Sequence, residues 1–151
     1  MEPADCNDAA AVWWHSRRSG HPHLPAPIHC EEQVRGWFAD ILLPDAQTWV
    51  ALDGDRVVAV LTLDGDDLDQ LYVDPDHAGQ GIGSMLVDLA KDLRPGGLAL
   101  WTFQTNLPAQ EFYRVHGFTE VRRTDGAANE EKAPDLRLVW GTHPEALKSG
   151  P

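Results

Sequence analysis

Three glycines at alternate positions, Gly79, Gly81 and Gly83, constrain this chain more than any other feature of its sequence. They follow a β-prone run that Asp74-Pro75 ends, because proline fixes φ and lacks a backbone donor. They precede an amphipathic helical pattern, and glycines leave the N–H groups at the positive end of that helix unshielded. The stretch therefore predicts a strand, a loop and a helix that together hold an anion such as a phosphate or pyrophosphate.

Two common phosphate-binding motifs do not fit this loop. The dinucleotide fingerprint needs a third glycine, but the chain has Ser84 or Leu86 there, depending on where the motif begins. A P-loop needs Gly-Lys followed by Ser or Thr, and the loop contains no lysine. The loop must therefore belong to another class of phosphate-binding protein.

Residues 78–83, Ala-Gly-Gln-Gly-Ile-Gly, resemble the acetyl-CoA-binding motif of the GCN5-related N-acetyltransferases, the GNAT superfamily. The family pattern is a basic residue or Gln, two residues of any kind, Gly, any residue, and Gly or Ala. Ala78 departs from it, because the family usually has Arg or Gln at that position. The resemblance implies that backbone amides from Gly79 to Ser84 hold the CoA phosphates, with one side-chain contact missing.

A second motif, at residues 106–118, resembles the family signature of Asn, a small residue, Phe-Tyr and Gly-Phe. The two motifs and the order of the elements extend the resemblance over residues 48 to 140, approximately. The expected elements are helices at 8–19 and 31–43, strands at 48–52, 57–63 and 68–73, the helix after the glycine loop, a strand at 98–104, a helix at 106–116, and strands at 118–123 and 136–140. Asn7 or Asp8 is expected to cap the first helix.

The order α-α-β-β-β-α-β-α-β-β predicts an α+β fold. The resemblance implies the three-layer GNAT fold, a mixed, mostly antiparallel central sheet flanked by helices. A chain of 151 residues is most simply one domain, with acceptor-side helices at 1–47, a core at 48–141 and a loose tail at 142–151.

Composition and charge limit which classes of binding partner and which cellular compartment we expect for this chain. The net charge of −12 disfavours nucleic acid and favours a cationic acceptor through long-range steering, unless the acidity serves only solubility. No apolar run is long enough to span a membrane, and the polar N-terminus is unlike a signal peptide. Cys6 and Cys30 are expected to be free thiols, so we predict a soluble, cytoplasmic protein without membrane association.

The resemblance assigns the cofactor contacts. The pantetheine arm would pair with the splayed edge of the strand carrying Leu71, Tyr72 and Val73, where the Val73 N–H would face the thioester oxygen. Asn106 would reach the pantetheine or the start of its own helix. The candidate acetyl-CoA residues are Leu71, Tyr72, Val73, Ala78, Gly79, Gln80, Gly81, Ile82, Gly83, Ser84, Asn106 and Tyr113.

Tyr113 is the candidate general acid for the CoA thiolate, because a phenol with a pKa of ~10 keeps its proton at neutral pH. Its alternative role is structural packing. Asp67 and Asp69 are the candidate bases, two residues apart and on one face if the strand pairs regularly. The alternative is a solvated turn end. His116 fits a charge partner for the helix C-terminus better than a catalytic group.

The acceptor side carries the least specific signals. Glu130 and Glu131, in the acidic loop 125–135, would attract an ammonium group, unless the loop is simply solvated. One of the three tryptophans Trp13, Trp14 and Trp37 is expected to line the acceptor pocket, and Trp37 is our candidate. The other two, like Trp101, are expected to pack in the core. His21, His23, His29 and Cys30 match no zinc spacing, so we expect no metal and interpret them as a surface loop that could cover the acceptor.

These observations predict an acetyl-CoA-dependent N-acetyltransferase that uses direct transfer in a ternary complex, because no nucleophile is placed to form an acyl-enzyme. The favoured acceptor is a small cationic amine. Protein N-termini or lysines are the alternative within the class, and a non-catalytic CoA-binding sensor is the alternative outside it. A homodimer is compatible with the resemblance.

Overall fold

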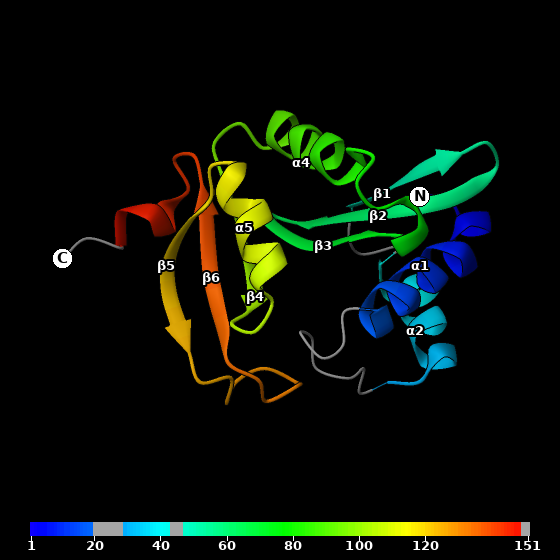
Figure 1. The fold of residues 1–151 in the computed structure, drawn as a ribbon, viewed down its shortest axis with the longest axis horizontal. Coiled ribbons are helices and arrows are strands. Elements are labelled where there is room, and N and C mark those ends of the chain that lie inside the picture. Colours follow the sequence, from blue (N-terminus) through cyan, green and yellow to red (C-terminus); the bar gives the residue numbers. More distant parts are fainter. Residues whose placement is uncertain (20–28, 43–46, 149–151) are drawn as a thin grey trace.

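One sheet of six strands organises the residues that the computed structural model of the protein describes, which are 1–19, 29–42 and 47–148. The strands are β1 (Gln47–Asp53), β2 (Arg56–Asp64), β3 (Asp67–Val73), β4 (Leu98–Phe103), β5 (Thr119–Thr124) and β6 (Asp135–Trp140). They lie in the order β1-β2-β3-β4-β6-β5, and every neighbouring pair is antiparallel except β3 and β4, which are parallel (Figure 1). The expected mixed, mostly antiparallel sheet is confirmed.

Helices cover both faces of this sheet, as the three-layer expectation requires (Figure 1). The helices are α1 (Cys6–Ser19), α2 (Glu31–Trp37), α4 (Ile82–Leu93) and α5 (Leu107–Val115), with short 3-10 turns at Pro3–Asp5 (η1), Pro75–His77 (η3) and Pro144–Lys148 (η4) and a π-helical turn at Phe38–Leu42 (η2). No helix of the described residues is long and apolar enough to cross a membrane.

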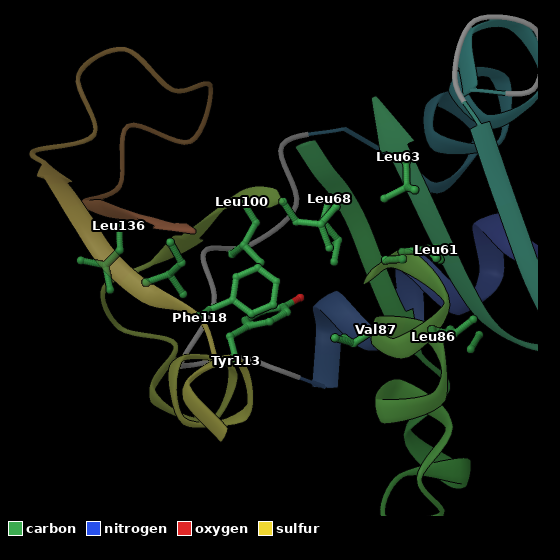
Figure 2. Close-up of a cluster of buried hydrophobic side chains, with 13 residues drawn as sticks. Leu61, Leu63, Leu68, Leu86, Val87, Leu100, Tyr113, Phe118 and Leu136 are labelled. Atoms are coloured by element: carbon green, nitrogen blue, oxygen red, sulfur yellow. The ribbon is translucent and has the colours of Figure 1, made fainter. Parts of the chain in front are cut away.

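Two hydrophobic clusters hold the layers together. On one face, α4 and α5 bury Leu86, Val87 and Tyr113 against sheet residues such as Leu61 and Leu100 (Figure 2). On the other face, α1 and α2 enclose a second cluster, whose members include Val12, Trp13, Val34, Phe38 and Val60. Each helix therefore places its apolar stripe on the sheet, which fixes the helix positions on either side of β3.

The first two helices each differ from the expectation in one detail. The first begins at Cys6, directly after the 3-10 turn Pro3–Asp5 that Glu2 caps, so the expected Asn7 or Asp8 cap is wrong. The second begins at Glu31 as expected, but its last turn, Phe38–Leu42, is a π-helix. Position 43, the expected end of that helix, lies outside the described residues.

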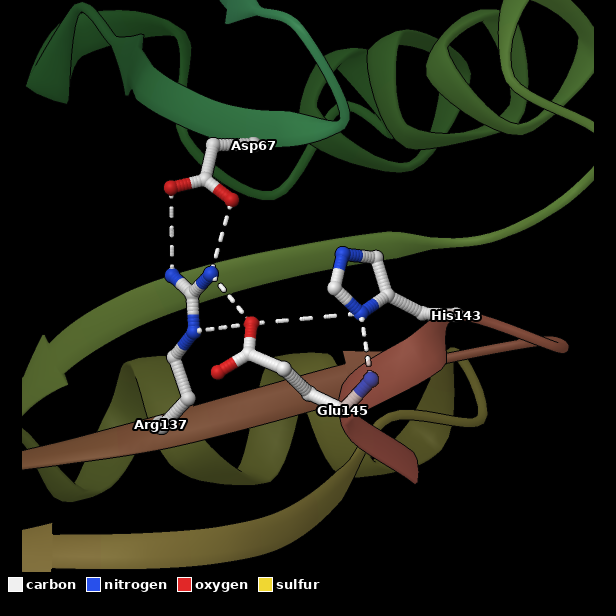
Figure 3. Close-up of polar contacts among 4 residues, drawn as sticks. All are labelled: Asp67, Arg137, His143 and Glu145. Atoms are coloured by element: carbon white, nitrogen blue, oxygen red, sulfur yellow. Dashed lines mark hydrogen bonds and ion pairs between the residues drawn. The ribbon is translucent and has the colours of Figure 1, made fainter. Parts of the chain in front are cut away.

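The expected loose tail is wrong for residues 142–148. Figure 3 shows Glu145 of η4 joined to Arg137 of β6, which reaches Asp67 at the start of β3 with two hydrogen bonds of 2.8 and 3.2 Å. The Glu145 backbone N–H also donates to Nδ1 of the buried His143 (3.1 Å). A guanidinium that is only 8% exposed needs these carboxylates, so charge pairing docks the segment on the sheet.

Replacing Arg137 should therefore destabilise the fold. We expect Arg137→Ala to lower the free energy of unfolding by about 2 kcal/mol, less than for a fully buried pair because both carboxylates are partly exposed. Urea denaturation measures this loss, and Arg123→Ala, at a surface pair with Glu120, is the control, with a loss below about 1 kcal/mol. Equal losses would contradict a special role for Arg137.

Hydrogen bonding from Arg137 lowers the pKa of Glu145. The stabilisation that depends on this charge is complete above the ordinary glutamate pKa and is lost as pH falls through the lowered value. The acid limb of the stability profile should therefore be less steep in Arg137→Ala.

Candidate active site

The sheet opens between its two parallel strands. β3 and β4 pair at Asp67 and Ala99, supported by the Ala99 N–H donating to the Asp66 carbonyl (3.0 Å), and within the described residues they pair at no later position. Each strand is held on its outer side instead, β3 by β2 and β4 by β6. The two strands therefore separate beyond Asp67 and leave backbone groups on their inner edges.

A cavity of about 200 Å³ lies at this opening. Five of the predicted site residues line it: Asp69, Leu71, Tyr72, Asn106 and Tyr113. The remaining lining residues come from β3, β4, α5 and the start of β6: Leu68, Leu100, Trp101, Thr102, Phe103, Ala109 and Asp135. Asn106 also caps α5, since its side-chain oxygen accepts from the Ala109 N–H (3.2 Å), so it has the expected role at the helix start.

The backbone of β3 turns the Val73 amide toward the opening. The next residue, Asp74, donates its N–H to the Val58 carbonyl of β2 (2.8 Å). Because consecutive amides of a strand point to alternate sides, the Val73 N–H points away from β2. The Val73 carbonyl accepts from Ser16 Oγ of α1 (2.7 Å), which fixes this end of the strand.

The glycine loop presents unpaired amides at the N-terminus of α4. Gly79 and Gly81 have φ of 78° and 80°, a conformation that side chains with a Cβ rarely adopt. The first backbone hydrogen bond of the helix runs from the Met85 N–H to the Gly81 carbonyl (3.0 Å). The N–H groups of residues 82–84 therefore have no partner within the helix. These amides form a cradle that fits a phosphate group.

Tyr113 is buried at 8% exposure, with its ring against Phe112 and Phe118 (centroid distances 5.1 and 5.4 Å), and Figure 2 shows it within the cluster between α5 and the sheet. Burial raises the pKa of its hydroxyl, and the neighbouring Tyr72 raises it further. The hydroxyl therefore keeps its proton at neutral pH while it lines the cavity.

Asp69 is placed by an irregularity in the sheet. The β2–β3 register pairs Thr62 with Gln70 and Leu63 with Leu68, so Asp69 is the extra residue of a β-bulge. Its carboxylate accepts from Gln70 Nε2 (3.3 Å), and Gln70 Oε1 accepts from Trp13 Nε1 (3.1 Å), so a short chain of hydrogen bonds orients it. Desolvation raises its pKa despite the Gln70 hydrogen bond, and Asp64 and Asp67 raise it further.

Asp67 does not share this position. The bulge makes the strand pairing irregular, and the Asp67 carboxylate binds Arg137 in a bidentate ion pair (Figure 3). Asp67 is absent from the linings of both described cavities that contain Asp69. Asp69 therefore remains the candidate base that lines both cavities, whereas Asp67 has an ion-pair contact with Arg137 instead.

A second cavity, of about 500 Å³, lies on the side of α1 and α2. The predicted acceptor residues Trp37, Glu130 and Glu131 all line it. The other lining residues are Trp13, Arg17, His29, Gln33, Val34, Asp69, Gln70, Tyr72, Trp101 and Phe103. The two cavities share Asp69, Tyr72, Trp101 and Phe103, so the groups predicted for the cofactor and for the acceptor converge at these four residues.

Arg17 is the main residue of this cavity that the sequence analysis missed. Its guanidinium is buried and lies over the rings of Trp13 and Phe103 (5.1 and 5.7 Å). Burial raises the pKa of the neighbouring Tyr72 hydroxyl, and the Arg17 charge opposes that rise. Arg17 also pairs with Glu131 at 3.7 Å. The sequence does contain a signal for Arg17: it lies four residues after Trp13 and therefore on the same face of α1, the face that packs against the sheet.

The acidic loop is attached to the N-terminal part of the chain rather than freely solvated. Glu131 pairs with Arg17 of α1, and Glu130 pairs with His29, just before α2. The expected cover by the loop at 20–30 is seen only for His29, because residues 20–28, with His21 and His23, lie outside the described residues. Cys6 and Cys30 are free, as expected.

The expected burial of Trp101 in the core is wrong. Trp101 is 42% exposed, lines both cavities, and lies beneath the guanidinium groups of Arg122 and Arg137 (4.9 and 5.1 Å). No group of three or more His, Cys, Asp and Glu residues is arranged as a metal site in the part of the chain that the structure describes.

Comparison with known proteins explains this arrangement. Residues 44–120 match the family model of the acetyltransferase (GNAT) domain. The chain belongs to the GNAT acetyltransferase family. Like its family, this GNAT protein is an acetyl-CoA-dependent acyltransferase, and the cavity between β3 and β4 and the amide cradle of α4 fit that co-substrate.

Its relatives cover most of its length. The chain is 36% identical to the peptidyl-lysine N-acetyltransferase YjaB of Salmonella typhimurium, over 86% of this chain and 88% of the relative. It is 34% identical to the peptidyl-lysine N-acetyltransferase YiaC of Escherichia coli, over 85% and 86%. The solution structure of apo-form YjaB from Escherichia coli has a TM-score of 0.75, 27% identity and 93% coverage of each chain.

Proposed function

We propose that this GNAT protein transfers the acetyl group to the ε-amine of a lysine in a polypeptide. The observation that carries the proposal is the 500 Å³ cavity, which combines aromatic walls with carboxylates and meets the first cavity at Asp69. Aromatic faces suit both the alkyl stem of a lysine and its cation, and carboxylates attract the ammonium group. The acceptor amine would thus reach Asp69 before it reaches the acetyl group.

The names of YjaB and YiaC, peptidyl-lysine N-acetyltransferases, support this choice over the small cationic amine that the sequence favours. The small amine remains the second candidate, because a volume of 500 Å³ is also typical of a pocket for a small molecule. Both acceptors present a primary amine to the same group.

The proposed chemistry assigns one task to each residue. Acetyl-CoA supplies the activated acetyl group as a thioester. Asp69, directly or through a water, accepts a proton from the acceptor ammonium, and the freed nitrogen lone pair forms the new C–N bond. The Val73 N–H stabilises the negative charge that develops on the carbonyl oxygen. As the C–S bond breaks, the Tyr113 hydroxyl gives its proton to the departing sulfur. The new amide nitrogen then passes its surplus proton to the Tyr113 phenolate, and Asp69 releases the proton that it accepted to solvent.

A panel of acceptors tests the proposal. One peptide carries a single lysine and a blocked N-terminus, a second has arginine in place of lysine and a free N-terminus, and a polyamine represents small amines. Thiol release and mass spectrometry should show acetylation of the lysine peptide with the highest kcat/KM. Preference for the second peptide or the polyamine would overturn the lysine assignment, and binding without turnover on any acceptor would favour a sensor.

The acidic loop should contribute to acceptor binding. Replacing both Glu130 and Glu131 by Gln removes two carboxylates from the cavity and weakens the contacts with Arg17 and His29. We expect the acceptor KM to rise about fivefold, which corresponds to about 1 kcal/mol, the scale of a partly exposed charge pair. Acetyl-CoA affinity should not change, and Glu120→Gln, which lies outside both described cavities, is the matched control.

A further inference from the structure

Two consecutive residues of β3, Asp69 and Gln70, line the same 500 Å³ cavity. In a regular strand, neighbouring side chains point to opposite faces of the sheet. The bulge at Asp69 interrupts this alternation, and Gln70 Nε2 donates to Asp69 Oδ2 at 3.3 Å. The irregularity therefore brings a side-chain amide next to the candidate base.

The Gln70 amide has a single orientation that satisfies both of its neighbours. The Trp13 indole N–H can only donate, and it donates to Gln70 Oε1 (3.1 Å). The ionised Asp69 carboxylate can only accept, so it must receive Nε2–H. Turning the amide around would place N–H against N–H and oxygen against oxygen. Trp13 thus decides which end of the amide meets Asp69.

Trp13 is a fixed anchor, whereas Asp69 is exposed. Trp13 is only 8% exposed, and its ring packs against Tyr72 and Trp37 (centroid distances 5.9 and 6.4 Å). Asp69 is open to the cavity, and among the residues that the structure describes only Gln70 hydrogen-bonds its carboxylate. A packed residue of α1 therefore holds, through one amide, a carboxylate that would otherwise rotate.

We propose that Gln70 positions the Asp69 carboxylate for proton transfer and that Trp13 fixes the orientation of Gln70. The inference rests on the proposed function, in which Asp69 accepts the proton of the acceptor amine. With Nε2–H on one carboxylate oxygen, the other oxygen is left to face the amine or its water. Because Trp13 also lines the acceptor cavity, one residue both forms the wall of that cavity and orients the base.

Gln70→Met tests this, because it keeps the length of the side chain and removes both hydrogen bonds. A hydrogen bond to a carboxylate stabilises its charged form, so its loss should move the Asp69 titration to higher pH. Carbon-13 NMR measures this titration, with the Asp69 carboxyl assigned as the signal that Asp69→Asn lacks. The acid limb of the kcat profile should move in the same direction, and kcat at neutral pH should fall about tenfold.

Other charged groups share the cavities of Asp69 or act on its charge, and Gln70→Met changes none of them. They are Asp64 and Asp67 at the adjoining strand ends, Tyr72 of β3, Arg17 of α1, His29 before α2, Tyr113 of α5, Asp135 of β6, and Glu130 and Glu131 of the acidic loop. Gln33→Met is the matched control for the titration. It makes the same change in the lining of the cavity at a residue bonded to the Cys30 N–H, so the Asp69 titration should stay at the wild-type pH.

A double variant tests whether Trp13 acts through Gln70. Trp13→Phe keeps an aromatic ring but loses the donor, so it should move the Asp69 titration less than Gln70→Met does. Added to Gln70→Met, it should cause no further movement.

An Asp69 titration that is unchanged in Gln70→Met would overturn the proposal, as would a fall in kcat with the pH profile in place. The titration needs neither acetyl-CoA nor acceptor, so its outcome is separate from the proposed function. The assignment of Asp69 as the base fails on a different result, a wild-type kcat in Asp69→Asn.

Discussion

Tyr113→Phe should lower kcat about a hundredfold while leaving acetyl-CoA affinity and the fold intact. The ring keeps its contacts with Phe112 and Phe118, so only the hydroxyl is lost, and the free energy of unfolding should change by less than about 1 kcal/mol. The departing sulfur would then take its proton from water. Stopped thiol-release assays under saturating acceptor measure kcat, and titration with acetyl-CoA measures affinity.

The pH dependence distinguishes an acid from a packing residue. Burial and Tyr72 raise the pKa of Tyr113, so the wild-type rate should decline only as pH rises through a value above that of an ordinary tyrosine. That alkaline decline should disappear in Tyr113→Phe. Tyr72→Phe is the matched control, because Tyr72 lines the same cavity. Its alkaline decline should persist but begin at a lower pH, since Tyr72 contributes to the raised pKa of Tyr113. If Tyr113→Phe retains the wild-type rate at every pH, Tyr113 is not the acid.

Asp69→Asn should also reduce kcat about a hundredfold, because the amide cannot accept the proton of the acceptor ammonium. The pKa of Asp69 is raised, mainly by desolvation, so the wild-type rate should increase as pH rises through a value above that of an ordinary aspartate. The variant should show no such increase. Acetyl-CoA affinity should remain unchanged, since the carboxylate acts on the acceptor.

Asp67→Asn is the control for this variant, because the same chemical change is made two residues earlier on the strand. Asp67 binds Arg137, so its replacement should lower the unfolding midpoint but change kcat by less than about threefold. A hundredfold loss in Asp67→Asn with normal activity in Asp69→Asn would reverse our assignment of the base.

Local patterns predicted most of the fold. The hydrophobic periodicity of α4, the Asp-Gly turns between the first three strands and the motifs at residues 78–83 and 106–118 each report on neighbouring positions. Those patterns also located Tyr113 and the cavity-lining part of β3. The acceptor candidates Trp37, Glu130 and Glu131 also meet in one cavity, because the predicted order of the elements places the helix that carries Trp37 and the loop before β6 on the same side of the opening.

The missed features depend on contacts between distant residues. Arg137 and Asp67 are 70 positions apart, and nothing near either residue indicates their pairing or the docked tail. Arg17 acquires its role only when α1 lies against Tyr72 and the acidic loop. The bulge at Asp69 arises from a register between two strands, whereas the sequence of β3 alone predicts regular alternation.

That bulge has a consequence for how the family can vary. A residue with no partner across the ladder can change its length without altering the register of the sheet. Aspartate and glutamate should therefore be exchangeable at position 69, the shorter acid working through a water and the longer one by direct contact. The fold can thus adjust how far the proton-accepting side chain reaches, to suit amine substrates that bind at different depths, without moving any strand.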